Sequence, residues 1–244
     1  MPEPAFHAIA LVDIEGFGAR PNPVQKQVRE DLYRIVRTAL AEAGFDPSRV
    51  AQEDRGDGIL MIDPDASVLS WVGDFVHRLN LGLAEKARTT APIARIRLRV
   101  AVHHGLCEHD GEGWVGAAVN TTARLVDALP LKEALAAAEQ AHLALIVSRQ
   151  VFDDVIRHDY RSVDSSTFEQ VAINAKELRD EIAWIHVPGY TYPPGVTAAV
   201  TPPPEPPKPK KAKKPKPSPG GFTFNGPVEH NGDNVITKIV KGGR

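Results

Sequence analysis

The 244-residue sequence predicts an α+β domain in which helices pack on an antiparallel sheet. Three observations carry this prediction: short apolar or alternating runs, two long segments with apolar residues at helical spacing, and an element order of strand, helix, strand, strand, helix, strand. That order is the split βαβ arrangement of ferredoxin-like folds, which places an antiparallel sheet under two helices.

The first two elements are a buried strand and a long helix. Residues 6–13, FHAIALVD, form an apolar run that ends at Asp13, and a glycine-rich loop follows. Asn22 is expected to cap the helix, with Pro23 in its first turn. From there to Gly44, apolar residues recur at helical spacing, which predicts an amphipathic helix. These residues are Val28, Leu32, Ile35, Val36 and Leu40.

A hairpin, a second helix and a fourth strand come next. Residues 50–54 and 58–63 are typical of strands, and a tight Arg-Gly-Asp-Gly turn joins them. The alternating run at 96–105 predicts a strand. In a split βαβ arrangement the hairpin lies beside the end of the first strand, so Asp13 and Asp57 are expected to face one another. The helix between is predicted from Val68, Leu69, Val72, Val76, Leu79 and Leu83.

The remaining elements are expected to extend the sheet. Helices are predicted around residues 116–129 and 131–142, and a strand at 142–148. Residues 168–174 and 182–187 read as the closing strands. No internal repeat is apparent.

Beyond Pro188 the hydrophobic periodicity stops. We therefore assign residues 1–188 to the folded domain and 189–220 to a disordered linker rich in proline and lysine. Residues 221–244 recover some β-branched residues and are expected to form a short interaction tail. The tail could add a strand to a partner protein or self-assemble, as its weak resemblance to bacterial amyloid-signalling motifs also implies, or it could be disordered without a role.

Charge and cysteine content narrow the classes of partner. Six of the 29 lysines and arginines lie between Lys208 and Lys216, so the remainder of the chain is acidic. An acidic body makes a nucleic-acid-binding face unexpected, although the lysine segment could contact anionic lipid or nucleic acid. The single cysteine, Cys107, excludes an internal disulfide framework. With neither a signal peptide nor a membrane span predicted, we expect a cytoplasmic protein.

Three sequence blocks resemble the catalytic domains of class III adenylate and guanylate cyclases. ALVDIEGFG at 10–18 resembles the strand end that carries a metal-binding aspartate, and EDRGDGILMI at 53–62 resembles the hairpin that carries a second. Residues 97–125 resemble the strand, flap and Gly-x-x-Val-Asn-x-x-x-Arg helix of that family. The resemblance covers residues 6–187. It implies the class III nucleotidyl cyclase fold and an enzyme that converts a nucleoside triphosphate into a 3′,5′-cyclic nucleotide and pyrophosphate.

The implied reaction requires paired carboxylates. Two hard cations about 3.5 to 4 Å apart stabilise the charge that develops on the phosphate oxygens. Mg²⁺ or Mn²⁺ take oxygen ligands and need few from the protein. The resemblance implies two such ions per site, held by Asp13, Asp57 and the backbone carbonyl of Ile14. An aspartate at a strand end or in a Gly-Asp-Gly turn is usually a turn former, so it is the combination that favours a metal site.

A second group of residues is implied to bind the substrate. Asn120 and Arg124 lie four positions apart, on one helix face. In the family the asparagine positions the ribose and the arginine stabilises charge on the phosphate. Lys176 falls near the triphosphate-binding lysine, although Lys-Glu-Leu-Arg replaces the family's glycine-rich context. The resemblance also implies a head-to-tail homodimer with active sites at the interface, in which the aspartates of one copy face the Asn120 and Arg124 pair of the other, so that one subunit holds only half of each site.

The base specificity rests on Glu53 and Gly113. Guanylate cyclases carry a glutamate at the first position, and a carboxylate accepts hydrogen bonds from N1 and N2 of guanine, which favours GTP. The second position, usually polar, is Gly113. A pyrimidine substrate, giving cUMP or cCMP as in bacterial anti-phage systems, therefore stays an alternative. So does a catalytically silent cyclase-like regulator, or a protein that acts through its tail. His103 and His104 are not expected to form a metal pair, since adjacent strand residues point to opposite faces.

Overall fold

The computed structural model describes residues 3–46, 48–160, 162–175 and 178–196. The predicted interaction tail and most of the predicted linker lie outside these ranges, and so does Lys176. Within the described part of the chain, no helix is both long and apolar enough to cross a membrane.

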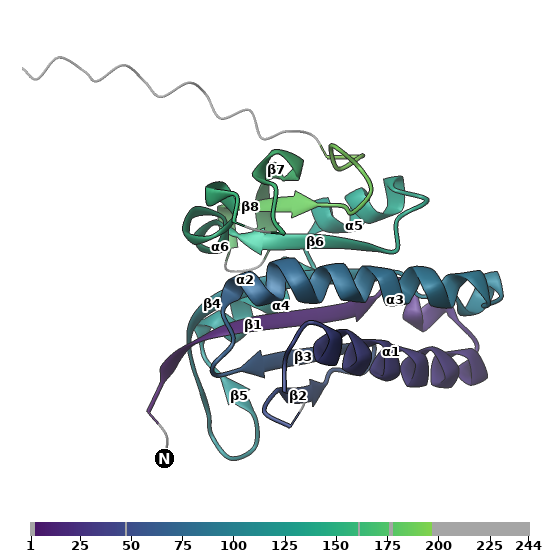
Figure 1. The fold of residues 1–244 in the computed structure, drawn as a ribbon, viewed down its shortest axis with the longest axis horizontal. Helices are drawn as coiled ribbons and strands as arrows, with labels where there is room; N and C mark the ends of the chain where they lie inside the picture. The colour runs from purple at the N-terminus through teal and green to yellow at the C-terminus, as the bar shows by residue number, and fades with distance from the viewer. Residues whose placement is uncertain (1–2, 47, 161, 176–177, 197–244) are drawn as a thin grey trace, which may run out of the picture. The chain divides into compact units, whose positions relative to one another are not determined.

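The predicted strands form one sheet in the order β2-β3-β1-β4-β6-β8-β7, with β5 paired to β4 (Figure 1). Neighbouring strands are antiparallel except β4 and β6, which run parallel. The predicted α+β sheet is confirmed, and the short strand β5 was not predicted. The strands are β1 (Ala5–Ile14), β2 (Ala51–Asp54), β3 (Gly58–Asp63), β4 (Leu98–His109), β5 (Trp114–Val115), β6 (Leu143–Ser148), β7 (Glu169–Ala175) and β8 (Leu178–His186).

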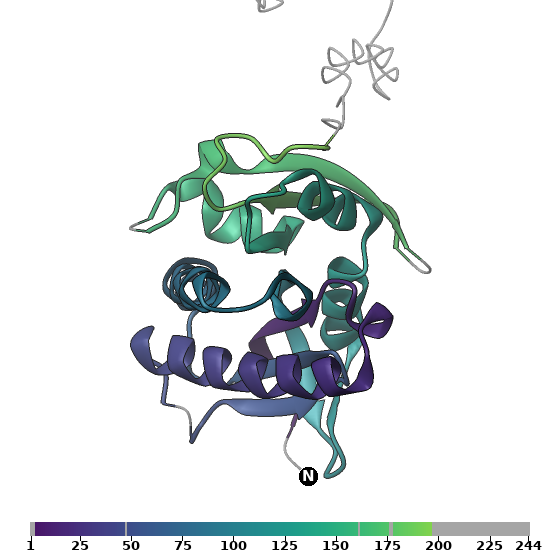
Figure 2. The ribbon, with the colours of Figure 1, turned by 90° about the vertical axis from the view of Figure 1, so that its right-hand side faces the viewer.

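Helices cover both faces of the sheet (Figures 1 and 2). Strand residues alternate between two cores: Val12 and Val100 pack with the side chains of α1 and α3, whereas Leu11 and Ala101 pack with those of α4 and α5. The second layer was not foreseen, because the split βαβ order accounts for α1 and α3 alone. The helices are α1 (Asn22–Glu42), α2 (Val68–Ser70), α3 (Val76–Arg88), α4 (Ala117–Val126), α5 (Leu129–Ala137) and α6 (Arg149–Asp154).

Two predicted helices differ in detail. Helix α1 begins at Asn22, so the cap position is Pro21 and the prediction of Asn22 as the cap is wrong. The carbonyl of Pro21 accepts the N–H groups of Val24 and Gln25, at 2.9 Å each, and the first-turn proline is confirmed. The second predicted helix is interrupted by a π-helical turn at Trp71–Phe75, between α2 and α3.

Helix α5 ends five residues before the predicted end of that helix, at Ala137 rather than residue 142. Arg97 holds the carbonyl groups that follow: its Nη2 donates to Ala138 at 2.9 Å and its Nε to Ala141 at 3.0 Å. These carbonyl groups therefore accept hydrogen bonds from the guanidinium instead of from the N–H groups of a further helical turn. Farther along, Tyr190 and Val196 pack against the core beside α5, so the described chain stays packed beyond Pro188.

Candidate active site

The sheet brings Asp13 and Asp57 together as predicted. Asp13 is paired with Gly58 in the β1–β3 ladder, and the backbone N–H of Ile14 donates to the carbonyl of Asp57 at 2.9 Å. Both aspartates line a cavity of about 230 Å³ between the hairpin and α4. The strand end and the turn therefore present two carboxylates to one space.

Gly58 allows this close approach. A Cβ at this position would lie 2.3 Å from the carbonyl oxygen of Val12. This distance is too short for a real contact, so the backbone of one strand would have to move. We expect Gly58→Ala to destabilise the protein by about 2 kcal/mol or more in urea unfolding. Gly18→Ala is the control, since a Cβ there meets nothing within 4 Å. Equal stability of the two variants would contradict this account.

Asp13 has a largely buried side chain that lies near several charged groups. Its side chain is 16% exposed, and Nε of Arg99 donates to its Oδ2 at 2.8 Å. Burial raises the pKa of Asp13; Arg99 opposes this shift, while the nearby carboxylates of Asp57 and Asp127 add to it. A bound cation would relieve the repulsion among these carboxylates. The described residues hold no group of three or more His, Cys, Asp or Glu side chains placed to bind an ion, so a hard divalent ion that keeps several waters is the kind that two carboxylates fit.

Two charged residues of the site were not foreseen from the sequence. Arg99 stands directly opposite Asp13 in the β1–β4 ladder. Asp127 caps the end of α4, lines the cavity and pairs with Lys132 at 3.1 Å. Strand alternation could have placed Arg99 on the same sheet face as Ala101, which packs in one core with the cavity-lining Leu11. Its pairing with Asp13 depends on the register of the two strands.

Helix α4 brings one of its two predicted residues to the cavity. Asn120 is exposed and lines it, together with Ala123. Arg124 is half-buried on the same helix and is not among the described residues that line the cavity. Among the described residues, one chain thus places the asparagine beside its own aspartates, whereas the resemblance implies that the asparagine and the arginine of the other copy face them.

The structure also brings Glu53 and Gly113 together. The backbone N–H of Trp114 donates to Oε1 of Glu53 at 2.6 Å, and a Cβ added at Gly113 would lie 3.1 Å from the same oxygen. Arg55 donates to Oε2 of Glu53 at 2.6 Å. Arg55 lines the cavity with the aspartates. The predicted pair therefore meets, with Arg55 as a third member that sequence reasoning missed.

Comparison with known proteins identifies the fold of the chain. No protein-family profile matches the chain, and no curated protein does. Solved structures do match: an adenylate/guanylate cyclase/hydrolase from Silicibacter pomeroyi is 21% identical, with a TM-score of 0.57 over 78% of this chain and 100% of that one. The chain has the fold of adenylate and guanylate cyclase catalytic domains.

Two fungal guanylyl cyclase domains share this cyclase fold. The RhGC domain from Catenaria anguillulae, solved in complex with GTP, is 15% identical, with a TM-score of 0.51 over 77% of this chain and 98% of that one. A non-canonical dimeric domain of the RhoGC fusion protein from Blastocladiella emersonii is also 15% identical, with a TM-score of 0.51 over 76% and 98%. At these identities the likeness establishes the fold of the chain.

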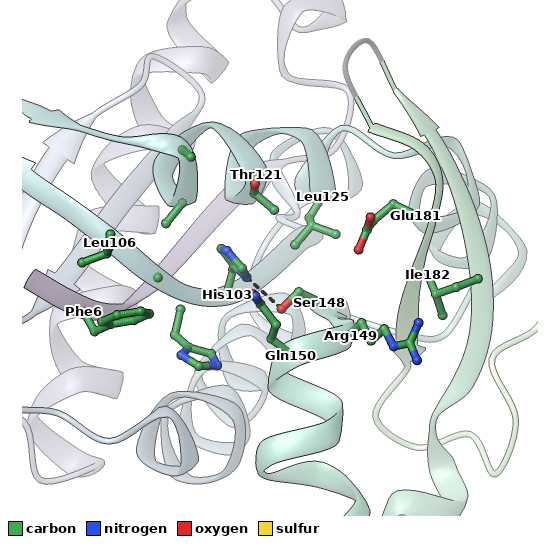
Figure 3. Close-up of a pocket in the computed structure, with 14 residues that line it drawn as sticks. Phe6, His103, Leu106, Thr121, Leu125, Ser148, Arg149, Gln150, Glu181 and Ile182 are labelled. Carbon is green, nitrogen blue, oxygen red and sulfur yellow. Dashed lines mark hydrogen bonds between the residues drawn. The ribbon is translucent and has the colours of Figure 1, made fainter. Parts of the chain in front are cut away.

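A second cavity of the cyclase fold, of about 510 Å³, lies on the other side of α4 (Figure 3). His103 lines it and is 6% exposed, with Nδ1 hydrogen-bonded to Oγ of Ser148 at 2.8 Å. His104 instead contacts Asp154, at 3.1 Å. The two histidines thus have separate hydrogen-bond partners, although both line this cavity.

His103 should make the stability of the cyclase fold depend on pH. Burial lowers its pKa to about 4, and His104 acts in the same direction. Between that value and about 6.5 the unfolded chain binds more protons, so the free energy of unfolding falls as the pH falls. We expect His103 to contribute about 2 kcal/mol to the loss between pH 7 and pH 5.

Urea unfolding at the two pH values measures this contribution. The loss should be smaller in His103→Gln than in the wild type, whereas His77→Gln, at an exposed position on α3, should match the wild type. A His103→Gln variant with the wild-type pH dependence would contradict the assignment.

Proposed function

We propose that this chain is a nucleotidyl cyclase, which converts a nucleoside triphosphate into a 3′,5′-cyclic nucleotide and pyrophosphate. The observation that carries the proposal is the convergence of Asp13, Asp57 and Asn120 on one cavity in a chain with the cyclase fold. In the reaction, the 3′ oxygen bonds to the α-phosphorus, the bond from that phosphorus to pyrophosphate breaks, and the 3′-hydroxyl proton leaves.

Two Mg²⁺ or Mn²⁺ ions are the proposed cofactors. Asp13, Asp57 and the carbonyl of Ile14 would hold them. When bound, such ions stabilise negative charge on the attacking and leaving oxygens. Both described contacts of Arg99 fall on Oδ2 of Asp13, so Oδ1 is the oxygen that we assign to a metal.

The remaining residues bind and orient the substrate. The Asn120 amide carries both a donor and an acceptor, and we assign it to the ribose. Arg99 donates to Oδ2 of Asp13, and we assign it to orienting that carboxylate. We assign Arg124 to the charge that develops on the α-phosphate and Lys176 to the triphosphate.

We propose that the active form is a homodimer. Arg124 is not among the described residues that line the cavity with the aspartates of its own chain, so we assign to this site the Arg124 of a second copy, together with the helix face that it shares with Asn120. A fungal guanylyl cyclase domain with this fold is a dimer, although a non-canonical one. Two equivalent sites would then form at a two-fold interface.

A base read by the Glu53 carboxylate would be guanine rather than adenine, which has no N1 donor, so GTP is the substrate proposed on that basis. Gly113 removes the usual polar partner, which keeps UTP and CTP as candidates. The purified protein should be incubated with each of the four triphosphates and Mn²⁺, and the cyclic products identified by mass spectrometry. EDTA should abolish product formation. A chain that forms no product from any of the four is not a cyclase.

A further inference from the structure

Both oxygens of the Glu53 carboxylate are held by groups of its own chain. Oε1 accepts the backbone N–H of Trp114, and Oε2 accepts Nη2 of Arg55, each at 2.6 Å. The backbone at Gly113 closes against Oε1, since a Cβ there would lie 3.1 Å away. The Glu53 side chain is 25% exposed. Each oxygen keeps a further lone pair, but these two charge-assisted hydrogen bonds hold the carboxylate against the flap and Arg55.

Arg55 is the member of this group that faces the cavity. It lines the cavity with Asp13, Asp57 and Asn120, and Glu53 is not among the described lining residues. The Arg55 side chain is 46% exposed. A guanidinium has five N–H donors and no acceptor, so the contact with Glu53 still leaves donors for a ligand. The hydrogen bond to Glu53 also orients the planar guanidinium of Arg55 before a ligand binds.

We infer that Arg55 reads the base and that Glu53 is a positioning residue, which ties Arg55 to the flap at Trp114. This inference rests on the nucleotidyl cyclase activity proposed above and assigns its specificity. A reader made only of donors selects a base that presents acceptors. Guanine offers the adjacent acceptors O6 and N7 to an arginine, and cytosine and uracil offer ring carbonyl oxygens, whereas adenine places the N6 amino donor beside its ring acceptors, where it opposes a guanidinium. The substrate class is thus a nucleoside triphosphate with a carbonyl-bearing base.

The two possible readers predict opposite results for Arg55→Met. If Arg55 reads the base, the variant loses affinity for GTP, CTP and UTP, while its affinity for ATP changes little. If Glu53 reads the base, removal of Arg55 frees Oε2, and selectivity for guanine rises.

The test measures binding of the four α,β-methylene triphosphate analogues to the full-length protein with Mn²⁺, by calorimetry. We expect the preference of the best carbonyl-bearing analogue over the ATP analogue to fall about tenfold to a hundredfold in Arg55→Met. Arg55→Lys keeps the positive charge but lacks the planar, forked set of N–H donors. Its preference for the carbonyl-bearing analogue should lie between those of Arg55→Met and the wild type. Arg49→Met, at an exposed arginine paired with Asp65, should keep the wild-type preference.

These analogues separate failure of this inference from failure of the proposed function, because binding needs no turnover. If the wild type binds none of the four analogues, both are overturned. An unchanged or increased preference in Arg55→Met, with binding retained, overturns the inference alone. The order of affinity among the GTP, CTP and UTP analogues identifies the base.

Discussion

Asp57→Asn is expected to reduce cyclase turnover on the order of 10³-fold or more while leaving the fold intact. The substitution keeps the size of the side chain and removes the charge needed to hold a divalent ion. The contact that joins the turn to β1 uses the backbone carbonyl of Asp57, which the variant retains. Cyclic product formed with Mn²⁺, quantified by mass spectrometry, measures the effect, and thermal unfolding checks the fold.

Asp65→Asn is the matched control for Asp57→Asn. Asp65 also follows a strand of the hairpin, but it is exposed and pairs with Arg49. Its replacement should leave turnover within about twofold, since surface substitutions of this kind have small effects. A folded Asp57→Asn variant that kept a tenth of the wild-type turnover would refute the proposed metal site.

Arg124→Ala is expected to lower turnover by about 10² to 10³, the cost of removing one donor from a developing oxyanion. If the partner subunit supplies this arginine, mixing Arg124→Ala with Asp57→Asn should restore activity. Random exchange makes half of the dimers mixed, each with one intact site of two, so about a quarter of the wild-type activity should return. The assay is cyclic product per subunit in the equilibrated mixture.

Single-variant preparations, equilibrated in the same way, give the background for this mixture. Activity at or below that background in a mixture shown by native mass spectrometry to contain the mixed dimer would place Arg124 and Asp57 in a site of one chain. The homodimer mechanism would then be wrong, even though each residue mattered separately.

Much of the fold could be predicted because its signals are local. Alternation and helical spacing located the principal strands and helices, and the hairpin order placed Asp57 beside Asp13. The π-helical turn at Trp71–Phe75 leaves the helical spacing almost unbroken, so periodicity could not reveal it. The two-residue strand β5 is too short to show any period.

The missed site residues depend on contacts beyond local pattern. Arg99 faces Asp13 through the register of two strands that are far apart in the sequence. Glu53 lies in β2 and Arg55 directly follows this strand, so the strand pattern did not predict their contact. That Glu53 turns to the backbone of Trp114 was not foreseeable either, because it follows from how the flap folds back. A carboxylate interpreted as a base reader is thus held by its own chain.

The parallel pairing of β4 and β6 has a consequence for how the site is assembled. Parallel neighbours cannot be joined by a tight turn, so the chain must cross over between them, and α4 lies in this crossover. The aspartates are secured by the antiparallel ladder of β1 and β3, and Asn120 reaches them from this crossover. Helix α4 packs mainly on β4 and β1, so the cavity that holds the aspartates and Asn120 is built on the antiparallel part of the sheet, before β6 joins it.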